Sequence, residues 1–377
     1  MKKTTRFQFR SVFQKVDKVL LVLVGLLVFF GLIFFLSASL SFLARNPAQF
    51  YRVLISHIGL GLIGGGAIMY ALLYLDYTVF KKYALPFFIT AIVLTFLVQV
   101  PFLSFEHGGA RRWLSLGPLS FQPAEILKVA YVMYLAAWFS WVKDKVQEIR
   151  WGLAPFLIIT AIPVLALFIQ PDNGTILIMG AAGVALYYLA GMRMRDALIL
   201  LVIATIGFLI VIQLRPYVMS RIQTFFAPSE NVLSEAWQSE QARIALGSGQ
   251  LLGRGWGKSV QKFRYLPEPA GDSIYAVIGE EFGFVGSVFV LILYTLFLLR
   301  AAVVAFRLPN AFARLLMFGL VLLIVGQSFF NMAAMMGIVP LSGMPLIFIS
   351  QGGTALFFAL VSTGIILNLS RLQKKHI

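Results

Sequence analysis

Apolar residues run through this sequence in long unbroken stretches, and residues 19–43, which contain no charged side chain, form the first of them. A helix rises about 1.5 Å per residue, so roughly 20 such residues cross the hydrocarbon core of a bilayer. Backbone groups cannot stay unpaired in lipid, and these segments are too long and too little alternating to be barrel strands. The sequence therefore predicts a bundle of transmembrane helices.

Composition excludes the other classes of protein. The 377 residues are 60% hydrophobic and only 12% charged, whereas soluble domains are about 45–50% apolar and about 25% charged. The chain has no Cys, which rules out a disulfide scaffold, thiol catalysis and Cys-ligated metals. We expect an all-α, polytopic integral membrane protein that forms one domain over residues 1–377.

About ten transmembrane helices are predicted. The first is expected to be a retained anchor, because its apolar run exceeds the roughly 7–15 residues of a signal peptide. The predicted spans lie near 19–43, 53–75, 83–103, 123–141, 153–170, 175–190, 197–214, 282–299, 314–336 and 345–368.

The formal net charge of +16 is explained by topology. If the N-terminus is cytoplasmic, the cytoplasmic segments hold 19 of the 31 Lys and Arg residues. Among them are Lys2, Lys3, Arg6, Arg10, Lys15 and Lys18, and at the other end Arg371, Lys374 and Lys375. This positive-inside bias predicts that both termini are cytoplasmic. Nucleic-acid binding is not needed to explain the charge.

One segment, residues 215–273, is a long extracytoplasmic loop in this topology. Loops longer than about 12–15 residues are uncommon unless they have a function. Within it, GSGQLLGRGWGKS lacks the spacing of a P-loop, and as a glycine pattern it is more typical of a flexible turn. Asp272 follows Pro267, Pro269 and Gly271 near the loop's end; on local pattern alone it fits a helix N-cap.

Ionisable residues gather toward the outer side, which favours a site near the outer surface over a transporter site at the midplane. Glu125 and Lys128 are three residues apart, so they share a helix face and can pair; a purely local ion pair is equally compatible. Arg111 and Arg112 stand beside Trp113 and fit interfacial anchors. His57 fits a hydrogen-bonded packing residue.

Five stretches, taken together, resemble the SEDS family (shape, elongation, division and sporulation), which includes FtsW, RodA and SpoVE. They are GGARRWLSLGPLSFQPAEILK, QPDNGT, QSEQARIALGSGQLLGRGWGKS, LPEPAGDSIYAVIGEEFG and PLIFISQGGTALF, between residues 108 and 357. The chain departs from the family pattern at Gly271, Ser273, Gln351 and Asn173. The EPAGDSIYAVIGEE stretch is more similar to FtsW than to RodA.

The resemblance implies a peptidoglycan glycosyltransferase that polymerises lipid II for septal wall synthesis at the outer face of a bacterial cytoplasmic membrane and releases undecaprenyl pyrophosphate. It places the essential carboxylate at Asp272, which we expect to act as the general base. The expected substrate-binding residues are Arg111, Arg112, Gln122, Glu125, Lys128, Arg243, Lys258 and Glu268. A divalent cation, Mg²⁺ or Mn²⁺, is a further candidate for neutralising the pyrophosphate.

The resemblance also implies a partner, a class B penicillin-binding transpeptidase. Three alternatives remain open on the sequence: a lipid II flippase, a RodA-like polymerase for cell elongation, and a scaffold that recruits other division proteins. A flippase would have to reach both leaflets, and a scaffold would tolerate loss of Asp272.

Overall fold

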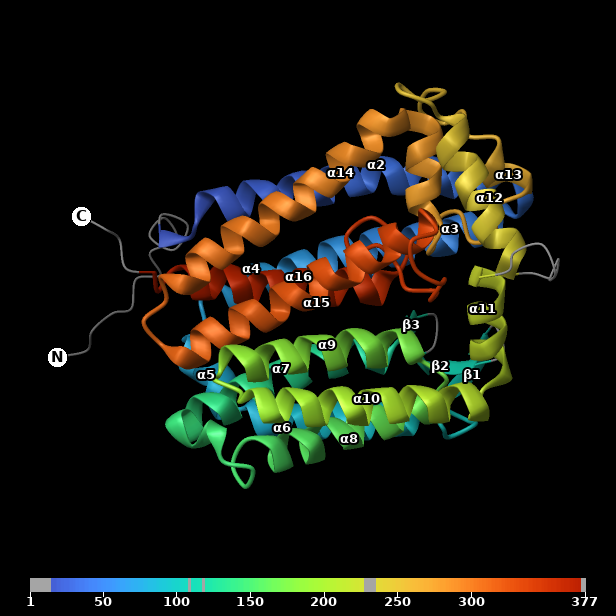
Figure 1. The fold of residues 1–377 in the computed structure, drawn as a ribbon. Coiled ribbons are helices and arrows are strands. Elements are labelled where there is room, and N and C mark those ends of the chain that lie inside the picture. Colours follow the sequence, from blue (N-terminus) through green and yellow to red (C-terminus); the bar gives the residue numbers. More distant parts are fainter. Residues whose placement is uncertain (1–14, 108–109, 117–118, 227–234, 374–377) are drawn as a thin grey trace.

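The computed structural model describes residues 15–107, 110–116, 119–226 and 235–373. Lys2, Lys3, Arg6, Arg10, Lys374 and Lys375, part of the predicted cytoplasmic charge, lie outside these residues. The described chain is an all-α bundle whose long helices run side by side (Figure 1). The predicted class of polytopic membrane protein is confirmed.

Seven segments of the described chain are long and apolar enough to cross a membrane. They are α2 (Lys18–Arg45), the continuous run of α3 (Pro47–Ile55), η1 (Ser56–Gly64) and α4 (Gly65–Leu72), α7 (Pro123–Val142) with η2 (Lys143–Gln147), α10 (Met194–Leu214), α14 (Ile274–Phe306), α15 (Ala311–Met335) and α16 (Gly353–Ser370). Three shorter apolar helices are α6 (Ala84–Leu97), α8 (Leu153–Ile169) and α9 (Asn173–Leu189). Together they occupy the ten predicted positions; the short helix α5 (Tyr77–Lys82) precedes α6.

Three predicted boundaries were wrong. The span predicted to end at 103 ends at Leu97, and the last one begins at Gly353 rather than near 345. The eighth begins earlier, at Ile274, but its helix breaks at Gly283, where φ is 66°. A side chain at Gly283 would collide with the backbone of Gly253 and Leu251, so the break is set by a close approach of two backbones.

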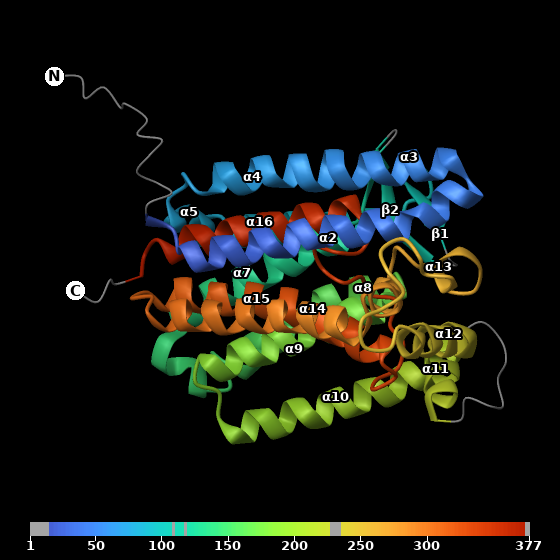
Figure 2. The ribbon, with the colours of Figure 1, turned by 90° about the horizontal axis from the view of Figure 1, so that it is seen from above.

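Burial separates a central group of helices from a peripheral one. In their most apolar windows, α16 is 89% buried and α10 only 6%. Figure 2 shows α10 along one edge of the bundle. Because lipid is the solvent for such a face, an apolar helix can stay stable with almost no protein cover. The central helices α7, α15 and α16 therefore form the core of the bundle, and α10 faces the membrane.

The two ends of the bundle differ. At one, which we call the terminal end, the Asp17 backbone N–H donates to Ser370 Oγ at 3.1 Å, and the Asp17 carboxylate pairs with Arg300 at 2.6 Å. The described chain thus begins and ends on the same side of the bundle. The opposite end, which we call the loop end, carries the small sheet and the short helices of the long loop.

The loop end is built from a small sheet and three short helices. The antiparallel strands β1 (Ser104–His107), β2 (Ala110–Leu116) and β3 (Leu119–Phe121) pair in that order. The helices α11 (Pro216–Phe226), α12 (Glu235–Ser248) and α13 (Gln261–Arg264) lie within the predicted long loop. The sheet was not predicted, because β1 and β3 are too short to show alternation and the sequence of β2, ARRWLSL, does not alternate strictly.

Small residues bring the second span against α16. A methyl group at Gly61 would lie 3.0 Å from Leu356 Cδ2, and one at Gly65 would lie 3.0 Å from Phe357 Cα. His57, in the π-helical stretch η1, is 2% exposed and stacks on Phe35 with ring centroids 3.9 Å apart. The glycines therefore permit a close approach of the two helices. His57 packs as expected, but its buried Nδ1 has no hydrogen-bond partner among the described residues, so the expected hydrogen bond is not confirmed.

Candidate functional site

A tight turn just before α14 presents Asp272 at the loop end. The Glu268 carbonyl accepts from Gly271 N at 2.9 Å and from Ser273 N at 3.3 Å. The turn is fixed from outside, because Ser350 Oγ donates to the Gly271 carbonyl at 2.7 Å. Gln351 N also donates, to the Ala270 carbonyl, at 2.7 Å. The position of Asp272 is therefore set by the segment that precedes α16.

The Asp272 carboxylate has few partners. Oδ1 accepts from Gln238 Nε2 of α12 at 3.1 Å and from Ser273 Oγ at 3.4 Å. Asp272 does not cap α14; the N-cap position belongs to Ser273, and no side chain caps it. The alternative that Asp272 serves as an N-cap is therefore wrong. Its carboxylate remains available for chemistry.

Electrostatics make Asp272 an unusual carboxylic acid. Burial of the side chain and the neighbouring negative charge of Glu268 raise the pKa of Asp272 to about 6, although Gln238, Arg221 and Ser273 act in the opposite direction. A carboxylate with a pKa near neutrality is a better proton acceptor than an ordinary Asp, yet it is still mostly ionised at pH 7. This is the profile of a general base.

Two amides on α15 connect Asp272 to the bundle core. Asn331 Nδ2 donates both to the Asp272 carbonyl and to the Met344 carbonyl, each at 2.7 Å. One turn earlier, Gln327 Nε2 donates to the Pro345 carbonyl at 3.0 Å. Both amides are 2% exposed. Together they hold the irregular segment before α16 directly beneath the carboxylate.

The predicted pair of Glu125 and Lys128 lies at the foot of this arrangement. Lys128 Nζ is 3.0 Å from Glu125 Oε1 and 2.8 Å from Gln327 Oε1. Both side chains are only 7% exposed. Pro123 opens α7 in its first turn, as predicted, with Gln122 half-buried before it. The expected pairing is confirmed, and Gln327 links it to the Asp272 region.

The two arginines of β2 have different surroundings. Arg112 Nε donates to the Gln170 carbonyl at 3.3 Å, and its Nη2 donates to the Pro171 carbonyl. Arg112 thus ties the sheet to the turn between α8 and α9. Arg111 is exposed on the same strand. For Arg112 the geometry adds an architectural role to the predicted contact with substrate.

The remaining candidate residues, Glu268, Arg243 and Lys258, lie on different parts of the loop end. Glu268 is exposed beside Asp272, where its Oε2 accepts from Gln351 Nε2 at 3.2 Å. Arg243 is exposed on α12 against Gly337, which follows α15. Lys258 instead lies on the glycine-rich stretch, exposed beside Gly255. The structure gathers Glu268 at Asp272 and places Lys258 on another part of the loop.

Sequence reasoning missed three residues around Asp272: Gln238, Asn331 and Arg221. Arg221 on α11 acts on the charge of Asp272 and donates to the Leu341 carbonyl at 3.2 Å. A signal existed for Asn331, because it follows Gln327 by four residues on an otherwise apolar helix and so shares its face. Gln238 carried no comparable local signal.

A second acidic cluster lies close by on α14 and is fully enclosed. Lys262 Nζ lies 2.5 Å from Glu281 Oε1 and donates to Ser37 Oγ of α2 at 3.0 Å. Glu280 accepts from Ser259 Oγ at 2.5 Å. Lys262 and Glu280 are 0% exposed and Glu281 is 1% exposed. Every charge here has a partner, so this cluster fastens the loop to α14 and α2.

The described residues hold no group of three or more His, Asp or Glu side chains arranged for a metal ion. Around Asp272, the only second carboxylate that the described residues bring close is Glu268. This donor set does not build a resident metal centre. A divalent cation that arrives with the substrate pyrophosphate would need only one or two carboxylates besides the phosphates, and it stays a prediction.

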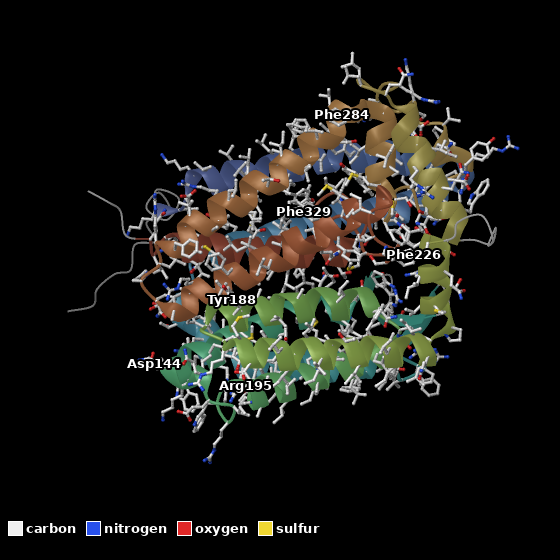
Figure 3. All side chains as sticks on the ribbon, viewed as in Figure 1. Asp144, Tyr188, Arg195, Phe226, Phe284 and Phe329 are labelled. Carbon is white, nitrogen blue, oxygen red and sulfur yellow. The ribbon has the colours of Figure 1, made fainter. Side chains whose placement is uncertain are left out.

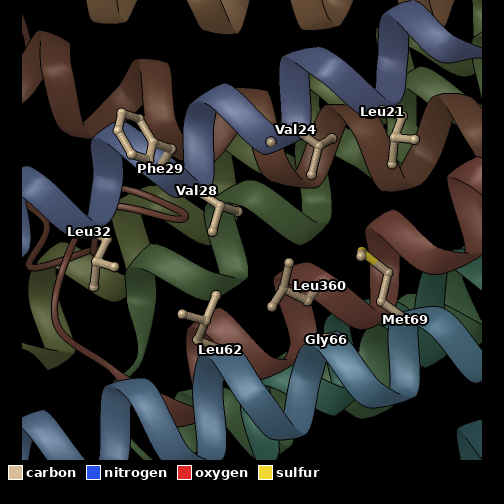
Figure 4. A pocket seen from close by; sticks show the side chains of 10 residues that line it. Leu21, Val24, Val28, Phe29, Leu32, Leu62, Gly66, Met69 and Leu360 are labelled. Atoms are coloured by element: carbon tan, nitrogen blue, oxygen red, sulfur yellow. The ribbon is translucent and has the colours of Figure 1, made fainter.

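An apolar groove of about 360 Å³ opens between α2, the second span and α16. Figure 4 shows Leu21 and Val28 of α2 facing Leu62 and Met69, with Leu360 of α16 between them. Only apolar side chains and glycines line it. Such a groove suits a hydrocarbon chain rather than a polar ligand.

Comparison with known proteins covers almost the whole chain. A family model described as cell cycle protein, covering FtsW, RodA and SpoVE, matches residues 17–375. A probable peptidoglycan glycosyltransferase FtsW from a Geobacter species is 33% identical, over 94% of this chain and 96% of its own length. The stage V sporulation protein E of Bacillus subtilis is 31% identical, over 95% of this chain and 98% of its own.

Solved structures agree with the relatives. A chain from a peptidoglycan synthase complex, described as coordinating polymerization and crosslinking, has a TM-score of 0.76 at 26% identity and covers 94% of this chain and 98% of that one. The rod shape determining protein RodA of Thermus thermophilus has a TM-score of 0.69 at 26% identity, covering 96% of this chain and 98% of that one. The observed helix arrangement is thus shared with these proteins.

Proposed function

The chain belongs to the FtsW, RodA and SpoVE family of cell cycle proteins, and from this premise we propose that it is a peptidoglycan glycosyltransferase that polymerises lipid II during septal wall synthesis. The FtsW names of its relatives support the division role. The observation that carries the chemistry is the half-buried Asp272, whose raised pKa of about 6 suits a base at neutral pH.

Asp272 acts as the general base. The acceptor sugar hydroxyl attacks the anomeric carbon of the donor, its proton passes to the Asp272 carboxylate, and the bond to the lipid pyrophosphate breaks. Gln238 holds one carboxylate oxygen at 3.1 Å, which leaves the other oxygen to face the hydroxyl. Asn331 fixes the backbone of the same residue. Both are positioning residues.

Cationic side chains around the turn neutralise the departing pyrophosphate. The positive charge of Arg221 already lowers the pKa of Asp272, and Arg243 lies on the neighbouring helix, α12. Arg111 and Arg112 on the sheet are further candidates for this role, and Lys258, on the glycine-rich stretch, is the weakest candidate. A diphosphate leaving group gains more from such charge than from protonation. Lys128, paired with Glu125, supports the segment before α16 through Gln327, and Gln122 precedes the same helix.

The lipid part of the substrate explains why the enzyme lies in a membrane. The apolar groove between α2, the second span and α16 would hold a stretch of the prenyl chain while the sugars stay at the loop end. The loop end then faces the outside of a bacterial cytoplasmic membrane, and the terminal end faces the cytoplasm. The positive-inside distribution of Lys and Arg supports this orientation.

A class B penicillin-binding transpeptidase is the proposed partner. The similar chain from a peptidoglycan synthase complex that coordinates polymerization and crosslinking supports this pairing. In such a pair, glycan strands made at the loop end would pass to the crosslinking enzyme on the same side of the membrane.

The test is polymerisation by the purified chain in liposomes, given labelled lipid II with and without a class B transpeptidase. We expect glycan strands from the wild-type protein, and none from Asp272→Ala at an unchanged melting temperature. Translocation of labelled lipid II is measured in the same vesicles. Translocation without polymer, or near wild-type polymer from Asp272→Ala, would overturn the proposal.

A further inference from the structure

The glycine-rich segment 249–260 does not stay at the outer end of the bundle. The depth of the loop can be followed along α2. Arg45, the last residue of α2, donates from Nη2 to the Phe263 carbonyl at 2.7 Å. Trp256 Nε1 donates to the Ile33 carbonyl at 3.3 Å, twelve residues earlier in the helix, which corresponds to about 18 Å along its axis. The chain therefore descends between Phe263 and Trp256.

Further contacts place this part of the loop against α2 and α14. Lys262 Nζ reaches Ser37 Oγ at 3.0 Å. A methyl group at Gly257 would lie 3.9 Å from Leu40 Cδ1. On the other side, the Phe284 N–H donates to the Gln250 carbonyl at 2.8 Å. The segment thus lies beside the apolar parts of two membrane spans.

The outward side of the segment is apolar and uncovered. Leu252 is 76% exposed, Leu251 62% and Trp256 54%. They adjoin Phe284, which is 63% exposed where α14 resumes after its break. Figure 3 shows Phe284 at the side of the bundle, on the outer surface of α14. This surface continues the lipid-facing side of α14 further along the helix.

Much of the backbone of the segment is hydrogen-bonded within the protein, which is what a non-helical chain at membrane depth needs. The N–H groups of Arg254 and Gly255 donate to the carbonyls of Glu280 and Glu281 at 3.0 and 2.9 Å. The Glu280 carboxylate accepts from Val260 N at 3.0 Å and from Gln261 N at 3.2 Å. The buried carboxylates therefore replace the water that an exposed loop would use.

Two cations on the segment are compatible with lipid. Arg254 Nη1 lies 3.5 Å from Glu280 Oε1, and Lys258 is exposed beside Gly255. Both have long aliphatic stems, which pack along apolar surface while the charged groups reach toward the lipid headgroups. The positive charges also match anionic phosphates at that level.

We propose that residues 249–260 form a re-entrant segment immersed in the bilayer leaflet at the loop end, with lipid acyl chains covering Leu251, Leu252, Trp256 and Phe284. The partner is bilayer lipid, argued from the continuity of this surface with α14. The proposal goes beyond the expectation of a flexible turn and does not depend on the proposed reaction.

The absence of Cys makes the experiment direct. Leu252→Cys is spin-labelled in the full-length protein in liposomes, and the accessibility of the label to oxygen and to a water-soluble nickel complex is measured. Leu201→Cys on the exposed, apolar side of α10 is the lipid reference. Glu240→Cys on the exposed side of α12 is the aqueous reference.

We expect the ratio of oxygen to nickel accessibility at residue 252 to be at least about fivefold that at residue 240 and close to that at residue 201, because oxygen enters hydrocarbon and a polar complex does not. Leu251→Cys repeats the measurement. A label at 252 or 251 that resembles the one at 240, in protein with the wild-type melting temperature, would overturn the proposal.

Discussion

Asp272 and the pair Glu280–Glu281 lie within ten residues of each other at the start of α14, yet their surroundings are opposite. Glu280 and Glu281 are sealed from solvent and bonded to Ser259, Lys262 and backbone N–H groups. Asp272 is half-buried, has two side-chain donors, and faces the like charge of Glu268. Fully partnered carboxylates build structure; a partly partnered one with a raised pKa is suited to chemistry.

The sharpest test of this contrast replaces one carboxylate of each kind. Asp272→Asn is expected to lower lipid II polymerisation by about 10²–10⁴-fold, because the base is lost while the shape remains. Its melting temperature should stay near that of the wild type. Glu280→Gln, the matched control, should instead lower the melting temperature. Equal thermal losses in both variants would erase the distinction between them.

The next largest effect is the loss of stability when the buried ion pair between Lys262 and Glu281 is broken. Glu281→Gln leaves the Lys262 charge enclosed without its partner at 2.5 Å, so we expect a loss of about 3–5 kcal/mol in the free energy of unfolding. Chemical denaturation in detergent measures it. The double variant Glu281→Gln with Lys262→Met should recover part of that loss. If the double variant is no more stable than Glu281→Gln, the pair is not the source of the effect.

A smaller effect is expected at the foot of the site. Glu125→Gln removes the charge partner of Lys128, which keeps its hydrogen bond to Gln327. Turnover should fall by about tenfold or less, since the cavity is disturbed without loss of the base. Initial rates and melting curves are measured together. Unchanged turnover combined with unchanged stability would show that the pair supports neither.

The smallest effect is a shift in pH dependence. A base must be deprotonated, so activity should rise with pH and reach half its maximum near pH 6, the pKa of Asp272. Glu268→Gln removes a negative charge that raises this pKa, so the midpoint should move to lower pH. Polymerisation rates between pH 4.5 and pH 8, about the range in which such a group titrates, give the midpoint. A shift to higher pH would contradict the assigned electrostatics.

Much of the architecture could be predicted, because lipid imposes a simple rule on helix length. The ten apolar segments needed only counting, and the spacing of Glu125 and Lys128 gave their pairing. The last span was predicted to begin near 345 because PLIFI is apolar. In the structure the carbonyls of Met344 and Pro345 instead accept hydrogen bonds from Asn331 and Gln327. Apolar composition does not reveal which buried backbone is held by side chains.

The candidate site was predicted unevenly for a related reason. Asp272 was identified by family motifs, and its local sequence fitted an N-cap equally well. Gln238 lies 34 residues before Asp272, and the sequence between them does not indicate how α12 is oriented. Glu280 and Glu281 were counted among the ionisable residues that predicted a site near the outer surface, whereas the structure encloses them under the glycine-rich segment.

The side-chain amide of Asn331 links two segments of the chain. Asn331 Nδ2 donates to the carbonyls of Asp272 and Met344 at equal distance. It therefore joins the turn before α14 to the segment before α16. A displacement of either segment would strain the hydrogen bond to the other. Because Asp272 belongs to the first of these segments, a shift of the chain ahead of α16 would also move the backbone that carries the reactive carboxylate.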